Sequence, residues 1–316
     1  MENKIGNITV NITNRCNYLC THCSFDSGIK KIEECSTQEW IDFLKEAREG
    51  ENQGLDISGG EPTLRKDLQK IVKSGVSLGY KVKLLTNGAY LTDNLLQELK
   101  ISGLESIAIS LDGSNSSTHN AIRKKGEEEF NLTLEKIKLV KDYGFFIKVN
   151  TVAANSNLYD LPKVIELCEK IRVDEHRICY FTPTGRGGEY PDGIHPIKWL
   201  NFIRENLSTY RKNERVYIGI PFLEEKFQLD TACWLDRGIF PLHVLPNGDI
   251  YSCSIQASRR KPIGSIKGRN IKETVKLEKR TKSCCFDYSS YFENISGNEK
   301  IGYVCPLRKY KLKEII

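Results

Sequence analysis

Two kinds of hydrophobic pattern alternate along the first two thirds of the chain. The first is a short run of branched apolar residues, which has the length and composition of a buried β-strand. Such runs predict strands at residues 8–12, 54–58, 81–86, 106–111, 146–152 and 177–181. The second kind places apolar residues three and four positions apart, as in an amphipathic helix. These segments predict helices at residues 37–49, 67–78, 93–100, 131–143, 158–170 and 196–211.

Regular alternation of strand and helix predicts an α/β fold. Right-handed crossovers between such units give a parallel sheet covered by helices, either as an open doubly wound sheet or as a curved partial barrel. The first helix also has a capping-box pattern, because Ser36 is followed three positions later by Glu39. In both architectures the chemistry gathers at the carboxyl ends of the strands. We therefore expect functional residues just after the predicted strands.

The rhythm of strands and helices breaks beyond residue 211. Residues 242–254 read as a β-hairpin, because Asn247 and Gly248 suit the positive φ angles of a type I′ turn. Five of the eleven cysteines lie in this last third of the chain. We expect two domains, at residues 1–211 and 212–316.

Composition narrows the class of protein. With 316 residues, of which 39% are hydrophobic, the chain has enough apolar side chains for a sizeable core. No apolar run reaches membrane-spanning length, and the start of the chain lacks the layout of a signal peptide. A cytoplasmic protein without a membrane partner is therefore expected. The net charge of +6 comes with lysines spread over predicted helix surfaces, which favours a solvated surface over nucleic-acid binding.

The first cysteine cluster follows the first predicted strand. Eleven cysteines, an odd number, in a long chain without a secretion signal indicate metal ligation rather than a disulfide scaffold. Cys16, Cys20 and Cys23 are spaced by four and three positions, with no fourth thiol nearby. Structural zinc normally takes four ligands, whereas a [4Fe-4S] cubane held by three thiolates keeps one iron free for an outside ligand. The spacing favours the cubane, with zinc as the alternative.

A CxxxCxxC motif after an N-terminal strand resembles the hallmark of the radical S-adenosylmethionine superfamily. His22, the residue before the third cysteine, is aromatic as in that pattern. The resemblance implies that the free iron chelates the amino and carboxylate groups of S-adenosylmethionine. One electron from the cluster then cleaves the cofactor to methionine and a 5′-deoxyadenosyl radical, while the protein supplies placement and excludes water. The resemblance also implies a partial (β/α)6 TIM-like barrel.

The second predicted strand runs into Ser58-Gly59-Gly60-Glu61-Pro62, which resembles the GGEP motif of the same superfamily. Glycines let a ligand approach the backbone closely, and a carboxylate beside them can pair with an amine. By this resemblance, Gly59, Gly60 and Glu61 hold the methionine amino group of the cofactor. Taken alone, a glycine pair after a strand is more often a simple turn.

Further motifs follow the later strands and resemble cofactor contacts of the superfamily. Asn87 and Ser110 stand in TNG and SLDG segments, and the resemblance places them at the ribose or carboxylate of the cofactor. By the same resemblance, Arg123 pairs with that carboxylate. Asn150, a polar residue within an apolar run, also resembles a cofactor contact. Arg186 stands in a segment similar to the PTGRG of molybdenum-cofactor and haem-modifying relatives, and the backbone of this segment would border the adenine; a plain turn is the alternative.

The cysteines of the last third resemble a second cluster site. Cys253 closes a G-x4-C element on the second strand of the predicted hairpin, as in the SPASM or twitch extension of the superfamily. The chain departs from the seven-cysteine SPASM pattern and fits the shorter twitch form, with one auxiliary [4Fe-4S] cluster. Its expected ligands are Cys233, Cys253, Cys305 and one of the adjacent Cys284 and Cys285. Zinc is the alternative at this site.

Relatives with such extensions mostly act on ribosomally made peptides, so the expected activity is radical modification of a peptide by crosslinking or epimerisation. The cluster motif starts at residue 16, so we expect a separate leader-binding protein or direct capture of the peptide in the barrel. A flavodoxin- or ferredoxin-like protein would donate the electron. Radical dehydrogenation or rearrangement of a small molecule or cofactor precursor is the alternative. A non-catalytic metal-binding module is a third interpretation.

Cys179 lies on the sixth predicted strand, near the rim where the cofactor should end. Period-two alternation places Cys179 on the same face as Arg177 and Phe181. If that face is the barrel interior, the thiol can donate hydrogen to a substrate radical, as a cysteine does in epimerising relatives. The other interpretation is a small buried apolar residue.

Overall fold

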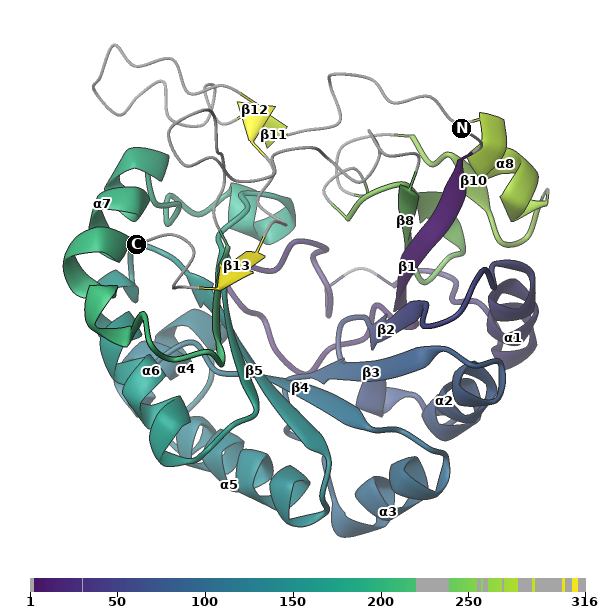
Figure 1. Cartoon of the computed structure of the whole chain (residues 1–316). Helices are drawn as coiled ribbons and strands as arrows, with labels where there is room; N and C mark the ends of the chain where they lie inside the picture. Colours follow the sequence, from purple (N-terminus) through teal and green to yellow (C-terminus); the bar gives the residue numbers. More distant parts are fainter. Residues whose placement is uncertain are drawn as a thin grey trace.

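The computed structural model describes residues 3–29, 31–219, 239–254, 257, 261–268 and 270–277, and short strands at 286–287, 303–304 and 309–311. Its framework is one large, curved β-sheet (Figure 1). At the centre of the sheet, parallel strands follow the order of the chain, one for each predicted run. They are β1 (Lys4–Asn11), β2 (Gly54–Ser58), β3 (Lys81–Thr86), β4 (Ser106–Ser110), β5 (Phe146–Ala153) and β6 (Glu175–Tyr180). The predicted α/β fold is confirmed, and the sheet takes the curved form of a partial barrel.

The sheet continues on both sides of these strands. β7 (Val216–Gly219) pairs in parallel with β6, and β8 (Ile239–Val244) pairs in parallel with β1. Antiparallel strands then extend the two edges: β9 (Asp249–Tyr251), β10 (Gly264–Ser265) and β13 (Lys309–Lys311). β11 (Phe286–Asp287) and β12 (Tyr303–Val304) form a separate antiparallel pair. The domain boundary expected at residue 211 thus falls shortly before β7, a strand of the same sheet.

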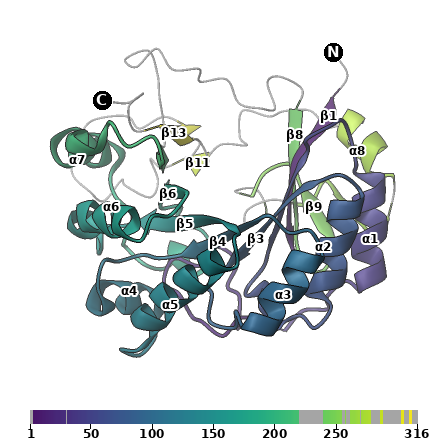
Figure 2. The same ribbon diagram turned by 60° about the horizontal axis from the view of Figure 1, so that its bottom comes forward.

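Helices cover the outer, convex side of the sheet (Figures 1 and 2). The predicted helical segments correspond to α1 (Thr37–Glu46), α2 (Leu68–Ser77), α3 (Asp93–Ile101), α5 (Glu129–Asp142), α6 (Leu161–Lys170) and α7 (Pro196–Asn206). The capping box of α1 is confirmed, since Ser36 and Glu39 exchange hydrogen bonds. The hydrophobic pattern missed α4 (Ser116–Arg123) and α8 (Ile271–Leu277). Both helices are short, and α4 has only Ala121 and Ile122 as apolar residues.

Two local predictions are wrong in detail. The helix predicted over 196–211 ends at Asn206, and the chain continues as the 3₁₀ turn η4 (Ser208–Tyr210). The β8–β9 hairpin is confirmed, but its turn is not type I′. In the turn only Gly248 has a positive φ, 94°, and its N–H donates to Leu245 O, as in a type I turn followed by a left-handed glycine. Pro246 favours this form because its ring fixes φ near about −65°.

The apolar core lies between the sheet and its helices. Alternate side chains of a strand point to opposite sides of the sheet. The outward-facing Leu55, Ile57 and Leu84 are fully buried, in one cluster with Trp40 of α1. A second cluster around Trp199 joins β6 and β7 to α6 and α7. None of the helices in the described part of the chain is long and apolar enough to cross a membrane.

The inner side of the sheet is polar. Lys83 Nζ lies 2.9 Å from Asp56 Oδ1, and Lys148 Nζ lies 2.8 Å from Glu175 Oε2. These residues alternate along β2, β3, β5 and β6 with the buried residues of the outward face. Closed barrels of this type normally fill their centre with branched apolar side chains. The stability of this fold therefore comes from the layer between sheet and helices rather than from a packed interior.

This division predicts where truncation is costly. Leu84→Ala should lower the free energy of unfolding by about 2 to 5 kcal/mol, because Leu84 is fully buried and the truncation leaves a cavity. Ile101→Ala is the control, since Ile101 is 79% exposed, and it should change stability by less than about 0.5 kcal/mol. Urea unfolding followed by circular dichroism measures both. Equal effects of the two substitutions would contradict the assignment of the core.

Candidate active site

The loop that follows β1 lies over the carboxyl ends of the parallel strands and encloses a pocket of about 230 Å³. Backbone hydrogen bonds attach this loop to segments that follow β2, β4 and β6; one of them runs from Thr21 N to Ile122 O at 3.0 Å. The pocket wall collects residues predicted from separate motifs: Cys16, Cys20, His22, Cys23, Gly59, Gly60, Asn87, Ser110, Arg123, Asn150 and Arg186. A larger cavity of about 450 Å³, between α6 and β6, includes none of them.

The three thiols of the motif differ in exposure. Cys20 is buried, Cys16 and Cys23 are half-buried, and all three are free. Burial raises the pKa of Cys16 to about 12, and the neighbouring Cys20 adds to that rise. Among the described residues, no three His, Cys, Asp or Glu side chains converge closely enough to hold a single metal ion. Cys16, Cys20 and Cys23 line one pocket, and three thiolates are the number that leaves one iron of a cubane free for an outside ligand.

The glycine pair after β2 presses against the cysteine loop. A Cβ on Gly60 would lie 2.3 Å from Arg15 O, and a Cβ on Gly59 would lie 2.6 Å from Thr13 O. The Gly60 N–H also donates to Thr13 O at 2.8 Å. Glycine is required here because the two backbone segments approach within hydrogen-bonding distance, which leaves no space for a side chain. The pair therefore fixes the height of the cysteine loop above the sheet.

Glu61 lies beneath the pocket rather than in its wall. Its side chain is fully buried, and its carboxylate accepts hydrogen bonds from Thr63, from the Thr86 hydroxyl at 2.7 Å and from the Asn87 N–H at 2.7 Å. Burial raises the pKa of Glu61, although these donors oppose the rise. Asn87 in turn donates to Asn17 of the cysteine loop at 2.8 Å. Glu61 thus holds the end of β3 in place, which positions Asn87 against the loop.

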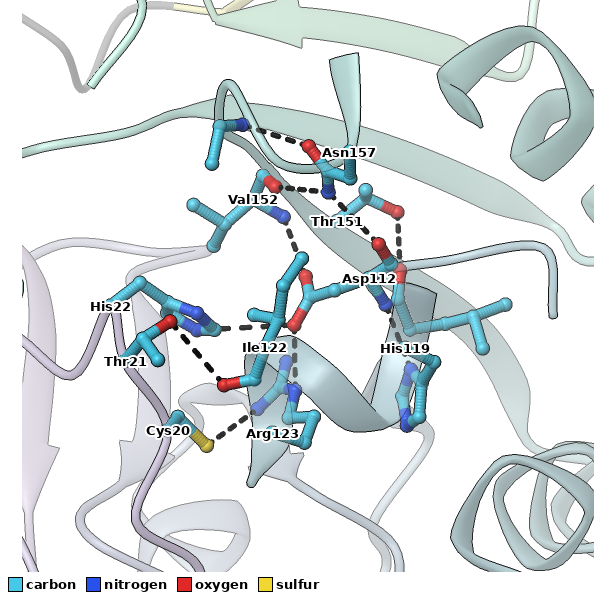
Figure 3. A network of polar contacts seen from close by, with 12 residues as sticks. Cys20, Thr21, His22, Asp112, His119, Ile122, Arg123, Thr151, Val152 and Asn157 are labelled. Atoms are coloured by element: carbon cyan, nitrogen blue, oxygen red, sulfur yellow. Dashed lines mark hydrogen bonds and ion pairs between the residues drawn. The ribbon is translucent and has the colours of Figure 1, made fainter. Parts of the chain in front are cut away.

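A buried ion pair lies at the centre of the polar network in Figure 3. Arg123 Nε lies 2.6 Å from Asp112 Oδ2, with side chains 8% and 0% exposed. Arg123 Nη1 also donates to Cys20 Sγ at 3.6 Å. Burial opposes both charges, yet each partner stabilises the other, so the pKa of Arg123 is raised and the pKa of Asp112 is lowered. His22 Nε2 lies 3.9 Å from the same carboxylate oxygen.

Neighbouring segments hold Asp112 rigidly (Figure 3). Its second carboxylate oxygen accepts the Val152 N–H at 2.8 Å, and its carbonyl accepts from the Asn157 side chain at 2.9 Å. Its own N–H donates to His119 Nδ1 at 3.1 Å, and burial lowers the pKa of His119 to about 4, so that nitrogen is available as an acceptor. The SLDG motif contains Asp112 but does not reveal these contacts, because its partners come from β5, α4 and the loop after β5.

Several buried polar atoms at the pocket have no hydrogen-bond partner within the described part of the chain. They are the Tyr18 hydroxyl, His22 Nδ1 and Arg186 Nη1. Arg186 is otherwise fixed, because its Nε donates to Cys20 O at 2.9 Å. Burial lowers the pKa of His22 to about 4, so its imidazole is neutral. Buried polar atoms are nearly always satisfied in folded proteins, so these atoms indicate a polar ligand in the pocket.

The remaining predicted site residues lie elsewhere. Cys179 is half-buried on β6, where it pairs with Val152, two residues beyond the pocket-lining Asn150 on the same face of the sheet. This register places Cys179 on the inner side. Cys253 follows β9 and packs against the apolar cluster around Trp199. Cys233, Cys284, Cys285 and Cys305 lie outside the described residues.

Comparison with known proteins agrees with this geometry. The family model described as the radical SAM superfamily matches residues 10–168. The chain belongs to the radical SAM superfamily. It is therefore an enzyme of that superfamily, whose members use S-adenosylmethionine and a [4Fe-4S] cluster, as the resemblance of the cysteine motif implied.

Two relatives with assigned activities are similarly distant. An AdoMet-dependent heme synthase of Methanosarcina barkeri is 31% identical over 200 residues, which cover 63% of this chain and 57% of that protein. The mycofactocin maturase MftC of Mycolicibacterium smegmatis is 31% identical over 269 residues, covering 82% of this chain and 67% of that protein. This chain thus spans little more than half of the heme synthase.

Solved structures share the fold. Streptococcus suis SuiB bound to its precursor peptide SuiA superposes with a TM-score of 0.70 at 13% identity, covering 89% of this chain and 69% of SuiB. Native anSMEcpe with bound AdoMet gives a TM-score of 0.66 at 17% identity, covering 85% of this chain and 80% of that one. At these identities the likeness shows the fold alone. It confirms the partial TIM-like barrel.

The glycine contacts lead to a test of the pocket. Gly60→Ala should weaken S-adenosylmethionine binding about tenfold or more, because a Cβ 2.3 Å from Arg15 O must displace the loop that carries Cys16. Gly126→Ala is the matched control, since a Cβ there meets nothing within 4 Å. Calorimetric titration of anaerobically reconstituted protein measures both affinities. An affinity of Gly60→Ala equal to that of the control would contradict the tight contact.

Proposed function

We propose that this chain abstracts hydrogen from a peptide by radical S-adenosylmethionine chemistry, and so introduces a crosslink or inverts an α-carbon. One observation supports the chemistry above all others: thiols, glycines and unpartnered polar atoms meet in one pocket at the strand ends. The pocket lies in a chain that belongs to the radical SAM superfamily. The peptide substrate is the finer part of the proposal and rests on other observations.

In this proposal Cys16, Cys20 and Cys23 hold a [4Fe-4S] cluster. With S-adenosylmethionine, the bound cluster supplies the electron and the carbon radical that remove a substrate hydrogen. The chain itself supplies placement. Gly59 and Gly60 set the position of the cysteine loop, which borders the pocket.

The cofactor contacts follow from the pocket wall. Asn87 follows β3, Ser110 ends β4 and Asn150 lies within β5, and all three present polar side chains to one space. His22 and Arg186 contribute the unpartnered atoms Nδ1 and Nη1 to the same pocket. We assign these five residues to the cofactor. Glu61 supports them from below through its hydrogen bond with the Asn87 N–H.

A peptide substrate is supported by the polar inner side of the sheet. Lys148 lies two residues before Asn150 on the same face of β5, and its ion pair with Glu175 continues the polar surface away from the cofactor pocket. Such a surface suits an extended, polar chain. The similarity to SuiB, solved with a precursor peptide, supports the same interpretation. Similarity to a heme synthase favours the second candidate, radical chemistry on a small cofactor precursor.

The region 212–316 carries the auxiliary site in this proposal. Cys253 follows the hairpin of β8 and β9, and its partners would be Cys233, Cys305 and one of Cys284 and Cys285, none of them among the described residues. A second [4Fe-4S] cluster would take these thiolates. A flavodoxin- or ferredoxin-like donor and a separate leader-binding protein complete the proposed set of partners.

Metal content tests the proposal. Anaerobically reconstituted protein should bind about eight irons, four for each cubane. Replacing Cys16, Cys20 and Cys23 together by Ala should remove roughly half of the iron. It should also abolish formation of 5′-deoxyadenosine, which liquid chromatography measures after reduction with dithionite. Cys168→Ala, at a buried thiol of α6, is the control and should keep both. Stoichiometric zinc in place of iron would contradict the proposal.

A second test concerns the fate of the substrate radical. If Cys179 donates hydrogen to it from the inner side of β6, Cys179→Ala should still form 5′-deoxyadenosine but lose the inverted product. Turnover of the unmutated enzyme in heavy water should place deuterium at the substrate α-carbon, detected by mass spectrometry. Inverted product from the Ala variant, or product without deuterium, would remove Cys179 from the mechanism. Crosslinking would then be the better assignment.

A further inference from the structure

The contacts of Arg123 differ from those expected of a simple cofactor ligand. Its guanidinium is already engaged on two sides, with Asp112 Oδ2 at 2.6 Å from Nε and Cys20 Sγ at 3.6 Å from Nη1 (Figure 3). Cys20 and Arg123 are each less than one tenth exposed. A permanent positive charge thus donates a hydrogen bond to one thiol of the cluster motif, out of contact with bulk water.

We infer that Arg123, held in place by Asp112, is a positioning residue that raises the reduction potential of the cluster bound through Cys20. The inference rests on the proposed function at one point, that Cys20 is a cluster ligand. It goes further than that function, because it assigns control of the electron-transfer step to a residue outside the ligand set.

The charge on the ligand sulfur links Arg123 to the potential of the cluster. Hydrogen bonds to the thiolates of an iron–sulfur cluster are among the factors that set its potential. Reduction adds one negative charge, and a guanidinium beside the ligand stabilises that charge more strongly in a low-dielectric site than in water. Cys16 offers a comparison, since its sulfur accepts a neutral donor, the Tyr18 N–H, at 3.4 Å. A charged donor withdraws more electron density than a neutral one.

Asp112 has a defined part in this arrangement. It binds Nε, which fixes the plane of the guanidinium and directs Nη1 toward Cys20. The carboxylate cannot turn away, because Val152 N–H holds its other oxygen at 2.8 Å. The backbone reinforces the alignment: Thr21 N, next to Cys20, donates to Ile122 O, next to Arg123, at 3.0 Å. The thiol and the guanidinium are therefore held together from both sides.

The experiment is a redox titration of the reconstituted protein without S-adenosylmethionine, followed by electron paramagnetic resonance. Arg123→Gln should lower the potential of the cysteine-loop cluster by about 59 mV or more, a tenfold change in a one-electron equilibrium. Arg123→Lys keeps the positive charge but loses the planar guanidinium that bonds Asp112 and Cys20 together. The cluster potential of this variant should therefore lie between those of the unmutated protein and Arg123→Gln. The double variant Asp112→Asn with Arg123→Gln leaves no unpaired buried carboxylate, and it should keep the lowered potential.

Arg65→Gln is the matched control. Arg65 is buried to the same degree and pairs with Asp67 at 2.6 Å, but its other contacts are the carbonyls of Ile12 and Cys35. This variant should lose stability without a change in potential. A purely structural role for Arg123 would give the same result at both sites.

The measurements distinguish a failure of the Arg123 inference from a failure of the proposed function. An unchanged potential in Arg123→Gln and in the double variant, with the cluster assembled, overturns the inference alone. Weaker S-adenosylmethionine binding at an unchanged potential also overturns it and makes Arg123 a cofactor ligand only. Iron missing from the unmutated protein overturns the proposed function together with the inference.

Discussion

One ion pair shut off from water holds the parts of the site together. Asp112 lies two residues after β4, Arg123 lies in the last turn of α4, and their contacts reach Val152 on β5 and Cys20 in the loop after β1. Removing one partner of such a pair leaves a buried charge, at a cost of about 3 to 5 kcal/mol. The pair is therefore a constraint on geometry more than a source of stability. Arrangements of these segments that leave either charge buried without its partner are therefore disfavoured.

The inner side of the curved sheet can be polar because the apolar core lies between the sheet and its helices. The outward faces of the strands bury Leu55, Ile57 and Leu84 beneath the helices, and this layer supplies the hydrophobic free energy of folding. The inner faces are then free to carry Asp56 with Lys83 and other charged pairs. A pocket with thiols and charges can exist at the rim because its loop is anchored to segments that this outer layer already fixes. Function and stability thus occupy opposite sides of one sheet.

The sequence predicted most of the framework, because strands buried on one side and amphipathic helices leave periodic hydrophobic patterns. Strands β2 and β3 were predicted with their observed bounds, 54–58 and 81–86. Helix α4 has no such periodic pattern and was missed. It begins with Ser116-Ser117-Thr118 and is held by its N-cap and by contacts of Arg123 rather than by an apolar stripe. The turn type predicted at Asn247 is wrong because Pro246, one residue earlier, decides the conformation of the turn. Local pattern thus predicts elements better than it predicts the contacts between them.

The same limit applies to the site, and Glu61 illustrates it. The motif identified the residue, and resemblance suggested a carboxylate turned toward an amine. Its observed donors, Thr63, Thr86 and the Asn87 N–H, come from two segments, and a motif within one segment cannot reveal them all. With these donors the buried carboxylate is solvated by the protein itself. The Glu61 carboxylate then affects the pocket in two ways. It holds Asn87 in position, and its negative charge raises the pKa of Cys16, although burial and the neighbouring Cys20 contribute more to that rise. Adjacent residues of one motif therefore have different roles: Gly60 sets the distance between its segment and the cysteine loop, and Glu61 holds the end of β3 in place.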